Sequence, residues 1–479
     1  MINLNKLKVG HWPVFLISLL SAILNLFLPI ILVRLISPEE IGIYKLFFLY
    51  AQSIIFISLA GGPLYSVYYL VGKKNDSNKY LEQAWILNFA VSTICALIGF
   101  IFLKQISLII SISEKYTILL LLSAITSAPG GFYGEYLIAK GKRISGSIFN
   151  SGFEILKALV IVGAVYFTRD IHVAFWGFTI LFIIKLIMAI TFSIKEKIIT
   201  FSFDREKMRE VIKYCAPISI AGAMSFIVEK IDMIILSARL DPIHFAFYSM
   251  GCLVVPPLLL LEMSVQKVLI PSLSKAFHEN NFEEMRISYR QAQSDISYIM
   301  IPALFGLMIF NRPIIEILFT DKYMDSAHYL RLYAFTYLTY IIPHDSIPRA
   351  TGNTAWILKM YCILTPISIL VVSYCASHYG APGALISSVI FMFFPKIPGL
   401  IFSAQITKST VHQLIAWRAH LFYTSVNVVL LTFCYLLKPL FESEKMWFLI
   451  LGPIYAVIYL GVVNLIKHLK NKREFNHGI

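Results

Sequence analysis

Charged residues are scarce in this sequence of 479 residues: Asp, Glu, Lys and Arg together make up 14% of it, against about a quarter in typical soluble domains. Hydrophobic residues account for 58%. They come in blocks of about twenty residues, the length of helix that crosses the hydrocarbon core of a bilayer. This composition excludes an ordinary soluble domain and predicts an all-α integral membrane protein that crosses the membrane many times.

Cysteine and the common catalytic motifs are also scarce or missing. The six cysteines show no CxxC pair and no metal-ligand spacing, so we interpret them as small core residues. No HExxH, GxxxxGK[ST] or GxSxG motif occurs, and the eleven histidines include no i,i+4 pair. These absences predict a protein that is not an enzyme and that has no metal site and no cofactor.

The few charges present are mostly basic, which gives a formal net charge of +14. In a soluble chain this would suggest nucleic acid, but in a membrane protein the positive-inside bias of cytoplasmic loops explains it. We therefore expect no nucleic-acid partner.

Fourteen apolar blocks are long enough to be membrane spans. They are residues 12–33, 43–70, 85–103, 116–138, 148–167, 173–194, 212–236, 245–268, 296–319, 327–347, 355–376, 382–404, 419–437 and 446–466. Three blocks are interrupted by helix-bending residues, and these are Gly61-Gly62-Pro63, Pro129-Gly130-Gly131, and Pro395 with Pro398. The interruptions indicate either ordinary kinks or the bending points of a moving transporter.

The Lys and Arg residues between these blocks alternate in number from one side of the membrane to the other. With fourteen spans, one side receives 26 of them and the other side receives 10. By the positive-inside rule the first side is the cytoplasm. Both termini are therefore predicted to be cytoplasmic.

One stretch of sequence occurs twice, at residues 13–44 and again at 217–248, with a constant offset of 204 residues and no gaps. Each copy reads as an apolar helix, a short polar turn with a proline, and the start of a second helix. The matches that hold the register best are Pro13/Pro217, Pro38/Pro242 and Tyr44/Tyr248.

The two copies begin at the first and seventh predicted spans, so both halves enter the membrane from the same side. This predicts two parallel repeats related by an axis along the membrane normal, an arrangement found in secondary transporters. The expected organisation is an N-terminal six-helix lobe at 1–195, a C-terminal six-helix lobe at 196–406, and two additional spans with a tail at 407–479.

Several segments resemble the polysaccharide flippases of the multidrug/oligosaccharidyl-lipid/polysaccharide exporter superfamily. They are RLISPEEIGIY after the first span, YCAPISIAGAMSFIVEKIDMIILSARL in the seventh, IIEILFTDKYMDSAHYLRLYAF at the ninth-to-tenth junction, and IPRATGNT after the tenth. The resemblance implies two lobes around a central cavity in the bacterial inner membrane. It also implies that the protein moves a polyprenyl-diphosphate-linked oligosaccharide to the outer leaflet, for O-antigen, capsule or exopolysaccharide. The partners expected of such a protein are the lipid-linked oligosaccharide, membrane lipids, a polysaccharide polymerase and a chain-length regulator.

Four lysines lie far from the ends of their predicted spans: Lys157, Lys185, Lys230 and Lys396. A charge near the bilayer centre costs about 2.5–3.5 kcal/mol on insertion scales, so such a residue usually faces a cavity or a partner. We predict that these lysines line the cavity and bind the diphosphate head group. The alternative is local pairing, which is strongest for Lys157 because Glu154 lies three residues before it.

Two carboxylates in the seventh span, Glu229 and Asp232, lie three residues apart on either side of Lys230. A pair of this kind can share a proton or hold Na⁺, so we predict that it couples transport to an H⁺ or Na⁺ gradient. The alternative is that both carboxylates balance Lys230. Structural ion pairs are expected at i,i+4 spacing between Arg312 and Glu316 and between Asp345 and Arg349.

Three other functions stay open at this point. A cation-coupled multidrug antiporter would favour an acidic cavity, and a peptidoglycan-precursor flippase shares the cationic cavity. A glycan polymerase or ligase would need a large outer loop, and the longest predicted outer loops have only about a dozen residues.

Overall fold

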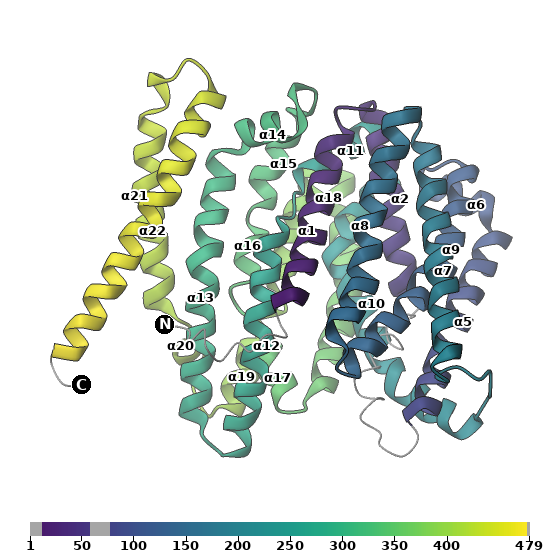
Figure 1. The fold of residues 1–479 in the computed structure, drawn as a ribbon. Helices are drawn as coiled ribbons and strands as arrows, with labels where there is room; N and C mark the ends of the chain where they lie inside the picture. Colours follow the sequence, from purple (N-terminus) through teal and green to yellow (C-terminus); the bar gives the residue numbers. More distant parts are fainter. Residues whose placement is uncertain (1–11, 58–76, 477–479) are drawn as a thin grey trace. The chain divides into compact units, whose positions relative to one another are not determined.

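The computed structural model describes residues 12–57 and 77–476. Within these ranges all regular secondary structure is helical and no strand is present (Figure 1). An α-helix satisfies its own backbone hydrogen bonds, as a lipid environment without water requires. The predicted all-α membrane fold is confirmed.

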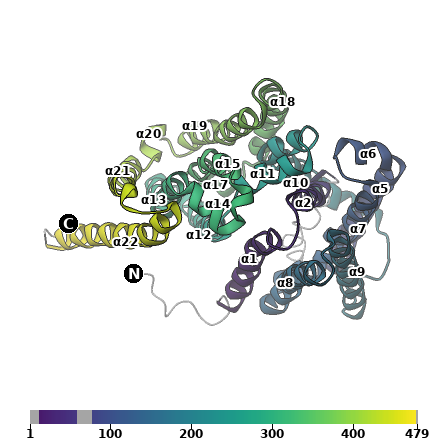
Figure 2. The same cartoon turned by 90° about the horizontal axis from the view of Figure 1, so that it is seen from above.

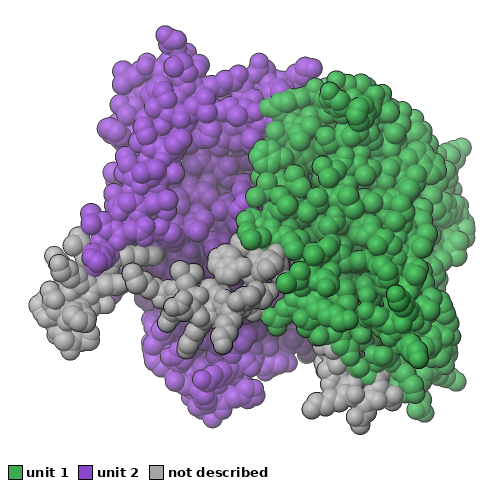
Figure 3. All heavy atoms as spheres, viewed as in Figure 1, with its two compact units in different colours: residues 1–246, 358–377 green, residues 247–357, 378–479 purple. Residues whose placement is uncertain are grey.

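The chain forms two compact units, which Figure 3 shows in different colours. Unit 1 comprises residues 1–246 and 358–377, and unit 2 comprises residues 247–357 and 378–479. The last boundary, between residues 377 and 378, lies inside α18 (Thr354–Phe393), close to Gly380, whose φ of 65° and ψ of −154° interrupt the helix. Glycine adopts this backbone conformation without the steric cost of a side chain. The lobes expected at 1–195 and 196–406 are defined by the sequence repeat and stay a prediction.

Unit 1 is a bundle of apolar helices with α7 at its centre. Its helices are α1 (Trp12–Leu32), α2 (Pro38–Ile57), α5 (Ser77–Ile101), α6 (Leu103–Ile109), α7 (Glu114–Ala139), α8 (Arg143–Thr168), α9 (Ile171–Lys195) and α10 (Arg205–Ser237). Figure 2 shows α5, α8 and α9 grouped around α7. The central place of α7 explains why 72% of its apolar stretch is buried, against 28% for α8.

The repeated stretch has the local structure that the sequence predicts. In the first copy α1 is followed by a turn and α2, and in the second copy α10 is followed by a turn and α11 (Pro242–Gly251). Pro38 and Pro242 each occupy the first residue of the second helix, where the missing N–H of proline has no cost. A Cβ at Gly42 would lie 1.8 Å from the carbonyl oxygen of Pro242. The two copies of the turn therefore touch, and only glycine fits at this contact.

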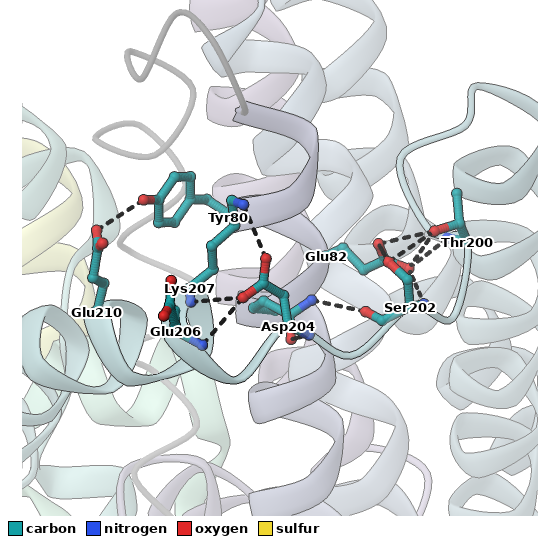
Figure 4. Close-up of polar contacts among 9 residues, drawn as sticks. Tyr80, Glu82, Thr200, Ser202, Asp204, Glu206, Lys207 and Glu210 are labelled. Carbon is teal, nitrogen blue, oxygen red and sulfur yellow. Dashed lines mark hydrogen bonds and ion pairs between the residues drawn. The ribbon is translucent and has the colours of Figure 1, made fainter.

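The connection from α9 to α10 is fixed to the beginning of α5 (Figure 4). The buried Glu82 carboxylate accepts hydrogen bonds from the backbone N and hydroxyl of Thr200, at 2.5 and 3.0 Å, and from those of Ser202, at 3.0 and 2.9 Å. The Asp204 side chain then caps α10 by accepting from the N–H groups of Glu206 and Lys207. A further bond from the Lys207 ammonium, 2.9 Å away, lowers the pKa of Asp204. The start of α10 is therefore positioned by polar contacts outside the apolar bundle.

Unit 2 combines long and short helices. They are α12 (Pro256–His278), α13 (Phe282–Ile309), α14 (Asn311–Phe319), η2 (Asp321–Tyr323), α15 (Ser326–Tyr333), α16 (Thr336–Thr339), α17 (Ser346–Ala350), α19 (Lys396–Ile406), α20 (Val411–Leu414), α21 (Trp417–Leu436), η3 (Lys438–Leu440) and α22 (Glu444–Asn476). The last two long helices form the yellow hairpin in Figure 1. The hydroxyls of Tyr455 and Tyr459 on α22 donate to the carbonyls of Pro302 and Tyr298 on α13, at 3.2 and 2.8 Å.

Nine helices among the described residues are long and apolar enough to cross a membrane, or ten if the bent pair α11–α12 is one span. The predicted count of fourteen is not confirmed by the described residues, among which residues 354–406 count as one long helix. The predicted span 245–268 is bent by 52° between its two helices. The predicted span 327–347 is divided among α15, α16 and the start of α17, so it is not a continuous helix.

The ninth predicted span, 296–319, is placed too late in the sequence. Helix α13 begins at Phe282, where Asn281 caps it by accepting from the N–H of Glu284 at 3.0 Å, and it ends at Ile309. Its first turns are rich in charge, so hydropathy misses them, whereas the cap and the acidic first turn are the signals that start a helix.

The expected bending points have different outcomes. Helix α7 continues through Pro129 and Gly130, and Pro395 lies directly before α19, which contains Pro398. Gly61-Gly62-Pro63 lies outside the described residues, as do Lys6, Lys8, Lys73 and Lys74 of the charge count.

Candidate functional site

The four predicted lysines are divided between the two units. Lys157 on α8, Lys185 on α9 and Lys230 on α10 belong to unit 1, whereas Lys396 on α19 belongs to unit 2. Each lysine is held by its own surroundings, so each is described with its own neighbours.

Lys157 forms an ion pair with Glu154, one helical turn before it on α8. Its ammonium also lies 5.9 Å from the centre of the Phe48 ring, within the range of a cation–π contact. The pair confirms the local pairing that the sequence indicates, and it leaves open whether Lys157 also contacts a substrate.

Lys185 is buried, with only 5% of the residue exposed, and it has no ion pair or hydrogen bond to another described residue. Three aromatic rings surround its ammonium, with centres at 5.5 Å for Phe182, 5.6 Å for Phe153 and 6.0 Å for Phe149. Ring faces partly replace the water that a buried ammonium loses. Helix α7 also passes close by, since a Cβ at Gly130 would lie 3.6 Å from Lys185 Cγ.

Carboxylates near Lys185 come from two neighbouring helices. The charges that act on Lys185 are Glu154 and Lys157 of α8 and Glu135 of α7. Glu135 accepts a hydrogen bond of 2.9 Å from the Asn150 side chain of α8. Two acidic and two basic groups therefore meet between α7, α8 and α9, and we call Glu135, Glu154, Lys157 and Lys185 the unit 1 charge cluster.

The two carboxylates of the predicted coupling pair on α10 differ in exposure. Glu229 is half exposed and forms an ion pair of 2.9 Å with its neighbour Lys230. Asp232 is buried, with 3% of the residue exposed. The pairing with Lys230 thus holds for Glu229, whereas Asp232 is buried.

Lys396 lies 3.1 Å, measured from its Nζ, from Nδ1 of the buried His344. Glu262 and Asp345 are the carboxylates whose charges act on it. Gly399, one turn further along α19, permits this contact, because a Cβ there would lie 2.7 Å from His344 Cβ. We call Glu262, His344, Asp345, Arg349 and Lys396 the unit 2 charge cluster.

The two predicted i,i+4 pairs have opposite outcomes. Arg349 and Asp345 form an ion pair of 2.6 Å, as expected. The prediction for Arg312 and Glu316 is wrong, because Glu316 pairs with Lys445 of α22 at 2.9 Å. Spacing along one helix could not reveal a partner that the fold brings from a distant helix.

Sequence reasoning did not select His344, which lies in an irregular segment before α17 without a motif around it. The feature of the sequence that could have indicated this site is a histidine beside an acidic residue in an otherwise apolar block. Among the described residues no group of three His, Cys, Asp or Glu side chains is placed to hold a metal ion.

Comparisons with known proteins agree with this fold. The chain has the fold of a lipid II flippase, MurJ, solved in an inward closed conformation, with a TM-score of 0.67, 19% identity, and coverage of 95% of this chain and 98% of that one. It also resembles an inward-facing multidrug resistance MATE family transporter of the MOP superfamily, with a TM-score of 0.57, 15% identity, and coverage of 81% and 94%. The chain therefore shares the fold of these multi-pass membrane proteins.

Comparison of the sequence assigns the chain to a family. A family model described as polysaccharide biosynthesis protein matches residues 31–328, more than half of the chain. An uncharacterized membrane protein in the cps region of Klebsiella pneumoniae is 23% identical over 343 residues, which cover 69% of this chain and 68% of that protein. The chain belongs to this family of polysaccharide biosynthesis proteins.

Proposed function

We propose that this protein is a flippase that moves a polyprenyl-diphosphate-linked oligosaccharide repeat unit across the bacterial inner membrane by alternating access, driven by an ion gradient. It performs no covalent chemistry. The repeat unit belongs to an O-antigen, a capsule or an exopolysaccharide. Family membership supports the link to polysaccharide biosynthesis, and a fold shared with a lipid II flippase supports lipid-linked transport.

The single observation that carries the proposal is the buried Lys185 ammonium, which aromatic rings surround and which no carboxylate contacts directly among the described residues. A diphosphate brings negative charges that need cationic partners inside the membrane. Lys157, Lys230 and Lys396 are the other cations that we assign to the path of the head group.

For coupling, Asp232 and Glu229 of α10 are the proposed ion-binding residues, and Asp232 is the stronger candidate because it is buried. A buried carboxylate exchanges its charge for a proton or pairs with Na⁺ more readily than an exposed one. No resident cofactor is proposed. The proposed partners are the lipid-linked oligosaccharide, membrane lipids, a polymerase and a chain-length regulator.

The test is a strain that lacks this protein. It should make the lipid-linked repeat unit normally, retain it on the cytoplasmic leaflet, and lose one surface polysaccharide. The measurement is extraction of the lipid-linked sugar together with its accessibility to a probe from outside. Normal arrival at the outer leaflet, with no second flippase present, would contradict the proposal.

The same experiment distinguishes the proposed function from two other transport functions. Accumulation of a peptidoglycan precursor in place of the repeat unit would favour the lipid II function that the MurJ neighbour carries. Drug sensitivity without any lipid-linked intermediate would favour a multidrug antiporter, the description of the MATE neighbour.

The proposed orientation, with both termini cytoplasmic, has its own test. Reporter fusions after Lys79, Arg143 and Lys213 should report cytoplasm, and fusions at Arg169 and Lys445 should report the opposite side. One inverted loop would contradict the proposed topology.

A further inference from the structure

Unit 2 contains a buried polar cluster in an otherwise apolar contact between four helices. Glu262 of α12 is 9% exposed, and His344 and Asp345, just before α17, are each 8% exposed. Leu269, Ile347 and Leu400 belong to the hydrophobic core that α12, α17 and α19 form around it. Such groups are costly to bury, so their charges must be balanced within the cluster.

The Lys396–His344 contact limits the protonation states that these two side chains can adopt together. Two positive charges 3.1 Å apart oppose each other strongly in a low-dielectric site, so the pair carries one positive charge in total. With Lys396 as the ammonium, Nδ1 of a neutral His344 accepts its hydrogen bond. The proton of His344 is then on Nε2, which is buried and has no hydrogen-bond partner among the described residues.

The carboxylates of the cluster differ in their partners. Asp345 is balanced by Arg349 at 2.6 Å. Glu262 accepts a hydrogen bond from the Gln266 amide and has no ion pair with another described residue. The positive charge of Lys396 stabilises the ionised carboxylate from a distance, without a direct contact. Glu262 is therefore the group of the cluster that can be either protonated or ionised while the other groups keep their charges.

The charges that act on Glu262 are those of Lys396, Asp345 and Arg349, and with the charge of Glu262 itself they sum to zero when Glu262 is ionised. Helix α12 contributes Glu262, the α17 segment contributes Asp345 and Arg349, and α19 contributes Lys396. Tyr289 of α13 is neutral, and its buried hydroxyl has no hydrogen-bond partner among the described residues. One proton on Glu262 changes the cluster from neutral to a single positive charge, with burial favouring the protonated form and Lys396 favouring the ionised form.

We propose that Glu262 is a proton-binding site of unit 2, tuned by the Lys396–His344 pair and separate from Asp232, and that it takes up and releases one proton in each transport cycle. The carboxylate gains a proton from hydronium to give the neutral acid and water, and the reverse step returns it. The role in the cycle rests on the proposed function, whereas proton binding does not.

The first experiment measures protonation alone, on the purified full-length protein in lipid and without substrate. Infrared difference spectra across pH should show a carboxylic acid band that Glu262→Gln removes. Glu279→Gln, at the exposed end of the same helix, should keep the band. A pH-dependent band that is unchanged in Glu262→Gln would overturn the proposal.

Lys396 gives a second measurement that a merely structural role would not affect. Removing its charge in Lys396→Gln should move the transition of the Glu262 band to higher pH, by about one pH unit. Lys396→Arg, which keeps the charge, should move it back toward the wild-type value. Equal transitions in both variants would overturn the role of Lys396, and this result does not depend on how well Glu262→Gln folds.

The second experiment addresses the transport cycle in cells. Transport by Glu262→Gln should be lower and should no longer respond when the pH gradient is collapsed, whereas Glu279→Gln should respond as the wild type does. A full response in Glu262→Gln would overturn the role in the cycle. Normal polysaccharide export by a strain that lacks the protein would instead overturn the proposed function, and the infrared result would still stand.

Discussion

Lys185 in unit 1 is buried and Lys396 in unit 2 is half-buried among apolar helices, and the protein stabilises the two ammonium groups in different ways. The charges of two carboxylates act on each lysine. Ring faces of Phe153 and Phe182 surround Lys185, whereas Lys396 donates to a histidine nitrogen. Aromatic faces attract a cation without neutralising it. We therefore expect a bound anion to gain more binding energy from Lys185. We expect the site around Lys396 to be better suited to binding and releasing a proton.

The largest expected effect separates these two roles. Lys185→Gln should reduce transport by roughly tenfold or more at normal protein abundance, because a buried charge-assisted contact to phosphate is lost. Lys185→Arg should restore most of it. The measurement is the rate at which the lipid-linked sugar becomes accessible from outside, with protein abundance determined in parallel.

The same substitutions at Lys396 sharpen the comparison. Lys396→Gln should change how transport depends on pH more than it changes the rate at one favourable pH. Equal pH profiles for Lys396→Gln and Lys185→Gln would contradict the division of roles between the two clusters.

The next effect is on stability and compares two glycines, one packed beside each cluster. Gly399→Ala should destabilise the protein by about 1–3 kcal/mol, as overpacking does, because its Cβ would lie 2.7 Å from Cβ and 2.9 Å from the carbonyl oxygen of His344. Gly130→Ala should be tolerated, since its Cβ would meet neighbours at 3.4 Å or more. Thermal unfolding in detergent provides the measurement.

Gly163→Ala is the matched control for this pair, because nothing lies within 4 Å of a Cβ there. It should be neutral or slightly stabilising, since alanine favours a helix over glycine. Loss of stability in Gly163→Ala similar to that in Gly399→Ala would show that the contact with His344 is not the cause.

A smaller effect compares one ion pair from each cluster. A double-mutant cycle on Glu154 and Lys157 should give a coupling energy of about 1 kcal/mol, and the cycle on Asp345 and Arg349 about 0.5 kcal/mol. The reason is the exposure of the cation: Lys157 has 15% of its side chain exposed, whereas Arg349 has 52%. The acids differ in the opposite sense, 37% for Glu154 and 12% for Asp345, so the expected difference is small. A larger coupling for the pair in unit 2 would reverse the ranking.

The smallest effect concerns the carboxylates of α10, which lie outside both clusters and serve as a reference. Asp232→Asn should weaken the dependence of transport on the H⁺ or Na⁺ gradient, and Glu229→Gln should weaken it less, because Glu229 is half exposed and already paired. The measurement is transport before and after each gradient is collapsed. Wild-type transport that ignores both gradients would rule out coupling at Asp232.

The sequence by itself determined the class of the molecule and much of its local structure. Apolar blocks of span length require helices in a bilayer, so most long helices lie where hydropathy predicts them. The sequence places the prolines of the repeat in a turn before a second helix, and in the structure Pro38 and Pro242 are the first residues of that helix, where proline loses no hydrogen bond. The local pairs Glu154–Lys157 and Asp345–Arg349 follow from spacing on one helix.

Only the tertiary structure decided which distant groups meet. Glu316 pairs with Lys445 and not with Arg312, and Lys396 meets His344 across more than fifty residues. The helix pattern could not predict these contacts, because side-chain periodicity specifies neighbours along one helix and says nothing about which helix packs against it. The environments of the four lysines were open for the same reason: the cost of burying a charge is evident from the sequence, but the partner that offsets it comes from the packing of helices far apart in the chain.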